Sequence, residues 1–251
     1  MSNIYHLSEL PTIGIEEEHF VVSAQTGDLF PLTEKVQRKL SSGVGEQLTF
    51  EYKACQLELR TSPATSGDKL NEEISELRAA ANMVLSSENL KLLTKSTHPT
   101  GKWADQPSRN DKRYRKIEMH HGQVVKRLLV SGLHIHVGTI LDRNVIVRRL
   151  AQLWPITPVL IAANASSELW EGRDTGHVSY RRNILIGLGA QCPPPAKTQS
   201  AYESHLGHVI EMNSVKSESD LWFDIRPGRK GLNTVELRSA DISGSGIQPA
   251  P

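Results

Sequence analysis

Long apolar runs are missing from this sequence, and so is an N-terminal leader. The hydrophobic stretches fall well short of the roughly 20 residues that a helix needs to cross a bilayer. Residues 1–6 lack the basic region and apolar stretch of a signal peptide. Cysteine is scarce as well: Cys55 and Cys192 lie far apart and form no motif, which favours free buried thiols over a disulfide. These absences predict a cytoplasmic protein that does not associate with a membrane.

An excess of charge of either sign is absent too. The 29 basic residues nearly balance the 28 acidic ones, for a formal net charge of +1, so no electrostatic attraction to nucleic acid is expected. Two catalytic signatures are also missing. Without Gly-x-x-x-x-Gly-Lys-Ser/Thr a P-loop NTPase is disfavoured. Without a Gly-x-Ser-x-Gly elbow an α/β-hydrolase is disfavoured.

The sequence does contain a mixture of strand-like and helix-like segments. Hydrophobic residues make up 38% of the 251 residues, enough for a core. The strands come in hairpin-like groups without a regular βαβ alternation, so we predict an α+β fold with a mainly antiparallel sheet. Strands are expected at residues 14–22, 48–52, 55–61, 128–138, 220–227 and 234–239. Helices are expected at 31–40, 68–93, 113–121, 144–169 (interrupted at Pro155 and Pro158) and 200–209.

One domain is expected to take up residues 1–241, because no linker and no internal repeat divides the chain. Residues 242–251 consist largely of Gly, Ser, Pro and Ala. That composition predicts a disordered tail.

Three consecutive carboxylates interrupt the first predicted strand. Successive side chains in a strand point to opposite faces, so Glu16 and Glu18 project to one side and Glu17 to the other. Like charges on one face repel each other, and a cation between them removes that cost. The alternative is an exposed edge strand whose charges discourage edge-to-edge pairing.

Four predicted strands carry polar residues two positions apart, and therefore on one face. Four such strands in one chain predict a sheet whose second face is a polar basin. Carboxylates with one or two imidazoles suit Mg2+ or Mn2+, and arginines on the same face suit phosphate or carboxylate oxygens. The pairs are Glu16/Glu18, Glu58/Arg60, His134/His136 and Glu236/Arg238, with Glu51 close to Glu58 in sequence.

Each of these patterns also has a plainer interpretation. A His-x-His pair is often two core or surface histidines, and it also occurs in zinc sites. Glu-Leu-Arg is common on ion-paired strand faces. The patterns taken singly leave both interpretations open.

Five stretches in this order resemble motifs of the glutamate–cysteine ligase type 2 family, the bacterial carboxylate–amine ligases. Together they span residues 12–241, nearly the whole chain. They are residues 12–20 (Thr-Ile-Gly-Ile-Glu-Glu-Glu-His-Phe), residues 56–61 (Gln-Leu-Glu-Leu-Arg-Thr), Gly132–Gly138, the loop Trp170-x-Gly172-x-Asp174-Thr175-Gly176-x-x-Ser179-x-Arg181, and Arg226-Pro227 followed by Thr234–Asp241.

The resemblance implies an ATP-dependent ligase related to glutamine synthetase, whose antiparallel sheet cups ATP and Mg2+, or Mn2+, with helices packed on the other face. ATP phosphorylates the γ-carboxylate of a glutamate-like substrate, and an amine then attacks the acyl phosphate and expels phosphate. The implied activity is a weak glutamate–cysteine ligase activity on small-molecule substrates. A homo-oligomer is expected for such an enzyme.

The same resemblance implies roles for individual residues. Arg226 and Arg238 would contact the phosphate or the transferring group, and Arg181 would bind the nucleotide with them. The metal-ligand candidates are Glu16, Glu18, Glu51, Glu58, His134 and Glu236.

Relatives of this family continue past the Glu-Leu-Arg strand by about a hundred residues, whereas ten residues follow Asp241 here. The short C-terminus motivates a second hypothesis, a non-catalytic nucleotide- or metal-binding homologue that acts as a partner subunit. A third hypothesis is a metal hydrolase built on His134 and His136 with Glu ligands, which predicts bound zinc and no requirement for ATP.

Overall fold

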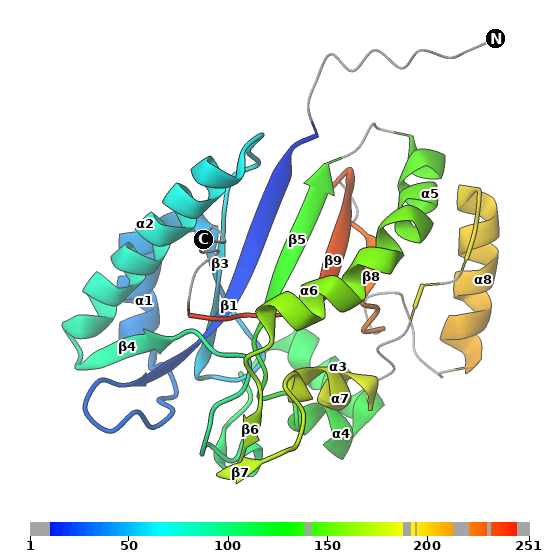
Figure 1. Ribbon diagram of the computed structural model, residues 1–251. Helices are drawn as coiled ribbons and strands as arrows, with labels where there is room; N and C mark the ends of the chain where they lie inside the picture. Colours follow the sequence, from blue (N-terminus) through cyan, green and yellow to red (C-terminus); the bar gives the residue numbers. More distant parts are fainter. Residues whose placement is uncertain are drawn as a thin grey trace.

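Seven strands form one sheet in the computed structural model (Figure 1). The structure describes residues 11–138, 142–187, 192–193, 195–212, 221–229 and 232–244. Every strand pairing among them is antiparallel, which confirms the predicted α+β fold. The order across the sheet is β2 (Leu48–Phe50), β3 (Gln56–Arg60), β1 (Ile13–Ser23), β5 (Gly132–Gly138), β9 (Thr234–Asp241) and β8 (Ile225–Pro227), and β4 (Leu90–Leu93) also pairs with β1.

The helices connect and flank these strands. A small hairpin of β6 (Leu169–Trp170) and β7 (Arg173–Asp174) stands apart from the main sheet. The helices described are α1 (Glu34–Val44), α2 (Gly67–Ser86), α3 (Lys112–His121), α4 (Gln123–Lys126), α5 (Arg143–Leu153), α6 (Thr157–Asn164), α7 (Tyr180–Ile186) and α8 (Gln199–Met212), with 3-10 turns at Gly45–Gln47, Trp103–Asp105 and Trp154–Ile156.

Helices cover one face of the sheet. α2 packs on β1 and β3, α1 packs on α2, and α5 and α6 pack on β9 (Figure 1). Ile15, Leu59 and Leu133 belong to the core that these strands share with Leu77 of α2. Because side chains alternate along a strand, the neighbours of these residues face the other way. The sheet therefore has one apolar, helix-covered face and a second face available for a site.

The predicted helix at residues 68–93 is correct at its start and wrong at its end. Ser66 accepts the backbone N–H of Lys69 and caps α2, which ends at Ser86. Asn89 then adopts φ +57°, a left-handed conformation that ends a helix. The leucines that follow form β4 beside β1. Their apolar spacing fits a helix or a strand, and only pairing with β1 decides between the two.

The predicted helix at residues 144–169 is interrupted as expected, but it ends earlier. The turn Trp154–Ile156 contains Pro155 and separates α5 from α6, which stops at Asn164. Within the described residues Arg143–Asn164 is the stretch long and apolar enough to cross a membrane by length and composition. That is weak support for a span, because α5 buries Ile146, Val147 and Leu150 against the strands.

The expected tail begins inside the folded part of the chain. Ile242 is buried in the main core, and Ser243 forms a β-bridge with Lys95. The Ile242 N–H donates to Ser96 Oγ at 2.7 Å. The expectation of disorder is therefore wrong for these residues, whereas residues 245–251 lie outside the described part of the chain.

Candidate functional site

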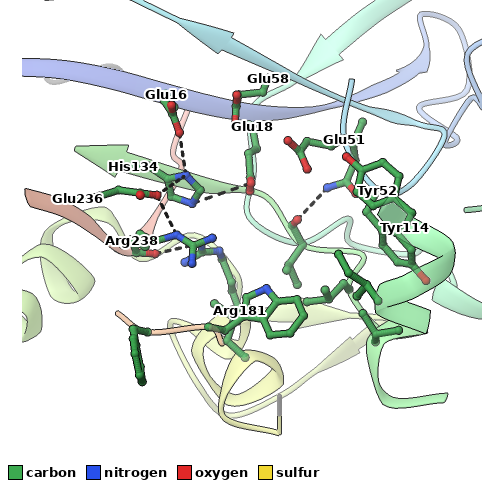
Figure 2. A pocket seen from close by; sticks show the side chains of 18 of the residues that line it. Glu16, Glu18, Glu51, Tyr52, Glu58, Tyr114, His134, Arg181, Glu236 and Arg238 are labelled. Carbon is green, nitrogen blue, oxygen red and sulfur yellow. Dashed lines mark hydrogen bonds and ion pairs between the residues drawn. The ribbon is translucent and has the colours of Figure 1, made fainter. Parts of the chain in front are cut away.

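The second face of the sheet gathers polar side chains from four strands, as the alternation predicts (Figure 2). Residues directly opposite each other in an antiparallel pair project from the same face. The strand register therefore brings together side chains that are distant in sequence. The opposed pairs are Glu16 with His134, Glu18 with Glu58, and His136 with Glu236.

Three groups of possible metal-ligating atoms overlap on this face. In each group, one atom from each of three side chains lies within 4.8 Å of the other two. All six metal-ligand candidates lie in these groups, and His136 joins them. The groups are Glu16, Glu58 and His134; Glu16, His136 and Glu236; and Glu18, Glu51 and Glu58.

Glu51 and Glu58 lie among other carboxylates, and their pKa values rise. Burial raises the pKa of the Glu51 carboxyl to about 7, and the charge of Glu18 adds to this effect. Burial, followed by the charges of Glu51 and its acidic neighbours, raises the pKa of Glu58 well above its usual range. Thr49 Oγ1 donates to Glu58 Oε1 at 2.8 Å, which offsets part of that rise.

Glu16 behaves in the opposite way because it lies between two imidazoles. Its Oε2 lies 3.4 Å from His134 Nδ1, and its Oε1 lies 3.4 Å from His136 Nε2. Burial by itself raises the pKa of Glu16, but the two histidines lower it below its ordinary value. Glu16 is therefore ionised at neutral pH, as a cation ligand must be.

Two arginines hold Glu236 on this face. Arg226 Nε donates to Oε2 at 2.7 Å and Nη2 to Oε1 at 3.0 Å. Arg238 Nε lies 3.0 Å from the same Oε1. Burial acts to raise the pKa of Glu236, but the charges of Arg238 and Arg226 bring it down to about 2. Glu236 is therefore an ionised carboxylate with both oxygens already engaged.

Arg181 lines the site, but its guanidinium is largely bound to the backbone. Nη1 lies 3.4 Å from Ser239 O and 3.2 Å from Ala240 O, and Nη2 donates to Arg238 O at 3.2 Å. Among the described residues its Nε has no hydrogen-bond partner. The side chain thus ties α7 to β9, and one N–H is left for a ligand.

Asp241 at the end of β9 sets the position of Arg181. Its carboxylate accepts Ser166 N–H at 3.0 Å, Ser167 Oγ at 2.6 Å and Ser179 Oγ at 3.0 Å. Ser167 Oγ in turn accepts the backbone N–H of Arg181 at 3.0 Å. The Asp in the last sequence motif is therefore a buried scaffold group and does not face the basin.

The carboxylates open into a pocket of about 930 Å³, a volume that includes open solvent. No sequence pattern predicted the apolar part of this pocket, because its members come from separate segments without a motif. We call this part the aromatic wall. It consists of Tyr52, Tyr114, Ile117, Val125, Leu128 and Trp222.

Two solved structures share this architecture. A glutamate–cysteine ligase from Francisella tularensis in complex with AMP matches with a TM-score of 0.66 and 16% identity, over 96% of this chain and 64% of that chain. A bifunctional glutathione synthetase from Pasteurella multocida gives a TM-score of 0.62 at 17% identity, over 92% of this chain and 35% of that one. The sheet and its acidic face define a chain with the glutamate–cysteine ligase fold.

The chain belongs to glutamate–cysteine ligase family 2, whose family model matches residues 12–249. A "Putative glutamate--cysteine ligase 2" from Ruegeria pomeroyi is 30% identical over 232 residues, 92% of this chain and 60% of the relative. A "Putative glutamate--cysteine ligase 2-3" from Rubrobacter xylanophilus is 32% identical over 236 residues, 92% of this chain and 63% of the relative. The family resemblance is confirmed, and the chain spans about 60% of the length of such relatives.

Proposed function

We propose that this protein is an ATP-dependent carboxylate–amine ligase with weak glutamate–cysteine ligase activity. The cluster of five glutamates and two histidines on the open face of the sheet carries the proposal. Family membership supports the same reaction class. The acid substrate is a glutamate-like amino acid, and the second substrate is an amine.

The donor set fits Mg2+ or Mn2+ better than zinc. Carboxylates outnumber imidazoles in all three overlapping groups: two groups hold two carboxylates and one imidazole, and the third holds three carboxylates. Oxygen-rich sites of this kind suit hard cations, whereas thiolates and imidazoles favour zinc. When bound, such cations neutralise phosphate oxygens during transfer. We assign the metal site to Glu16, Glu18, Glu51, Glu58, His134 and Glu236, with His136 as an additional candidate.

Repulsion among the carboxylates supports a cation site on the same face. The raised pKa values of Glu51 and Glu58 arise from burial and from neighbouring negative charges. A cation that binds to the ionised carboxylates relieves both effects. Cation binding is therefore coupled to proton release from these carboxyls.

The two arginines on β8 and β9 take different roles in this proposal. Arg238 lines the pocket, and we assign it to the transferring phosphoryl group. Burial and the nearby Arg226 lower its pKa to about 10, so the side chain remains charged at neutral pH. Arg226 is buried, with two donors on Glu236. We assign Arg226 to positioning Glu236.

The reaction balances without a nucleophilic side chain. The substrate carboxylate takes the γ-phosphoryl group of ATP, which gives ADP and an acyl phosphate. The amine nitrogen then forms a C–N bond to the acyl carbon, and the C–O bond to phosphate breaks. Overall the ammonium loses two protons, one of which remains on the released phosphate and the other enters solvent. Positioned positive charge is what this chemistry requires of the protein.

The test is ADP release by the purified chain with Mg2+ and ATP. Release must depend on both glutamate and an amine, and Glu18→Gln must abolish it. Titration calorimetry with a non-hydrolysable ATP analogue and Mg2+ distinguishes the ligase from a non-catalytic nucleotide-binding subunit. Analogue binding without any turnover would favour a nucleotide-binding partner subunit over an enzyme.

A further inference from the structure

The pocket continues past the carboxylates into an apolar end. All six residues of the aromatic wall form one hydrophobic cluster and also line the pocket. In Figure 2, Tyr52 and Tyr114 lie beside Glu51, on the opposite side of the view from His134. Apolar side chains that line a cavity favour an apolar ligand group, because its burial removes both surfaces from water.

The hydroxyls of both tyrosines and the side-chain amide of Gln56 at this end already have protein partners. Tyr52 OH donates to Glu118 Oε1 at 2.7 Å, and Tyr114 OH donates to Phe50 O at 3.3 Å. The side-chain amide of Gln56 donates to a backbone carbonyl at 2.8 Å. A nucleobase buried here would lose hydrogen bonds to water along its edges and gain few from the protein. An alkyl or aryl side chain needs none, so the aromatic wall suits such a group better.

Two arginines line the same pocket from exposed positions. Arg113, in the first turn of α3, holds its guanidinium 5.5 Å from the ring centre of Tyr114. Arg229 follows β8. Both lie close enough to Glu51 to act against the rise in its pKa. Neither forms an ion pair with a carboxylate of the described residues. They are suited to a ligand carboxylate.

We propose that the amine substrate is an α-amino acid with a large apolar side chain, of the leucine or phenylalanine type. Its side chain packs on the aromatic wall, its carboxylate pairs with Arg113 and Arg229, and its amino group is directed towards the carboxylate end of the pocket. This inference rests on the proposed ligase function and narrows its second substrate. The small side chain of cysteine leaves most of the aromatic wall unfilled.

Turnover with a panel of amines tests the acceptor class. Phosphate release is measured with Mg2+, ATP and glutamate, and with leucine, phenylalanine, alanine, cysteine or leucinamide as the amine. We expect kcat/KM for leucine or phenylalanine to exceed that for cysteine by about tenfold or more, as several additional buried methylenes allow. A preference for cysteine or alanine would overturn the proposal.

Variants separate the two parts of the site. Trp222→Ala should raise the KM for leucine by about tenfold and leave the KM for alanine and for ATP within about twofold. Arg229→Gln changes an exposed residue and should raise the KM for leucine but not the KM for leucinamide, which lacks a carboxylate. Met119→Ala, on the exposed side of α3, is the matched control. A rise in the KM for ATP in Trp222→Ala would instead assign the aromatic wall to the nucleotide.

Binding distinguishes failure of this inference from failure of the ligase assignment. Calorimetry measures leucine binding to the chain loaded with Mg2+ and a non-hydrolysable ATP analogue. Leucine binding that Arg229→Gln weakens, without turnover of any amine, would support the acceptor site and contradict the ligase. Turnover with glutamate and cysteine, without leucine binding, would support the ligase and contradict the acceptor site.

Discussion

Arg226 donates hydrogen bonds to both carboxylate oxygens of Glu236 across the β8–β9 pair, with N–O distances of 2.7 and 3.0 Å. The two residues lie directly opposite each other in the strand register, and both are buried. The pair keeps Glu236 ionised and fixes its orientation on the acidic face. It therefore connects the edge strand β8 to the proposed metal and phosphate site.

Removal of Arg226 should cost more than the loss of one hydrogen bond. Arg226→Met leaves Glu236 buried with a single guanidinium partner, so we expect the free energy of unfolding to fall by about 3 kcal/mol. Urea denaturation measures this change. Arg226→Met with Glu236→Gln should recover part of the loss, because position 236 then carries no buried negative charge, although Arg238 loses its carboxylate partner. A double variant no more stable than the single one would contradict this account.

The three glutamates of β1 provide a matched set for metal binding. Glu16 and Glu18 face the basin, whereas Glu17 accepts Arg78 Nε at 2.7 Å and lies 3.2 Å from His19 Nε2 on the core side. We expect Glu16→Gln and Glu18→Gln to weaken Mn2+ binding about tenfold or more. Glu17→Gln should leave Mn2+ binding unchanged and lower the free energy of unfolding by about 2 kcal/mol. Calorimetry and urea denaturation read the two effects; equal Mn2+ affinities in all three variants would exclude this metal site.

Gly132 leaves room for the guanidinium of Arg181. A Cβ at position 132 would overlap Arg181 Nη2, and the Gly132 N–H donates to Glu18 Oε2 at 2.6 Å. Gly132→Ala should therefore displace Arg181 and disturb Glu18, with loss of both ADP release and nucleotide-analogue affinity. Gly67→Ala is the control, because a Cβ there meets no atom within 4 Å. Unchanged analogue affinity in Gly132→Ala would show that Arg181 does not act at the site.

Lys53 predicts a specific dependence of stability on pH. Its Nζ donates to Gln106 O at 2.9 Å and Trp103 O at 3.2 Å, and burial lowers its pKa from 10.5 to about 8. Between those pH values the unfolded chain binds one proton more than the folded chain, so this residue makes unfolding less favourable as pH rises.

Lys53→Met removes that contribution. We expect the stability of the wild type relative to Lys53→Met to rise between pH 8 and 10.5 by on the order of 3 kcal/mol. Thermal or urea unfolding of both proteins across this range gives the difference. Burial raises the pKa of Cys55 to about 12 in the wild type. The contribution of Cys55 to the pH dependence is present in both proteins and cancels in this comparison. A difference that stays flat with pH would mean that Lys53 remains charged.

Local patterns predicted most elements of the fold, together with the strand faces whose side chains gather at the candidate site. The helix expected at residues 31–40 forms as α1, Glu34–Val44, between Thr33 and Gly45. The helix expected from residue 68 forms as α2, which Ser66 caps. The predictions failed where one pattern fitted two structures, as at Leu90–Leu93, or where burial depended on distant segments, as at Ile242. The aromatic wall was missed for the same reason.

The sequence by itself determined which side chains share a face, because alternation along a strand is a local property. It separated Glu16 and Glu18 from Glu17 before any neighbour was known. Only the tertiary structure decided which strands lie side by side and in what register. Glu16 and His134 are 118 positions apart, and their contact exists because β1 and β5 pair in one register. The same long-range packing brought the aromatic wall to the basin, and the register of β8 and β9 placed Arg226 on both oxygens of Glu236.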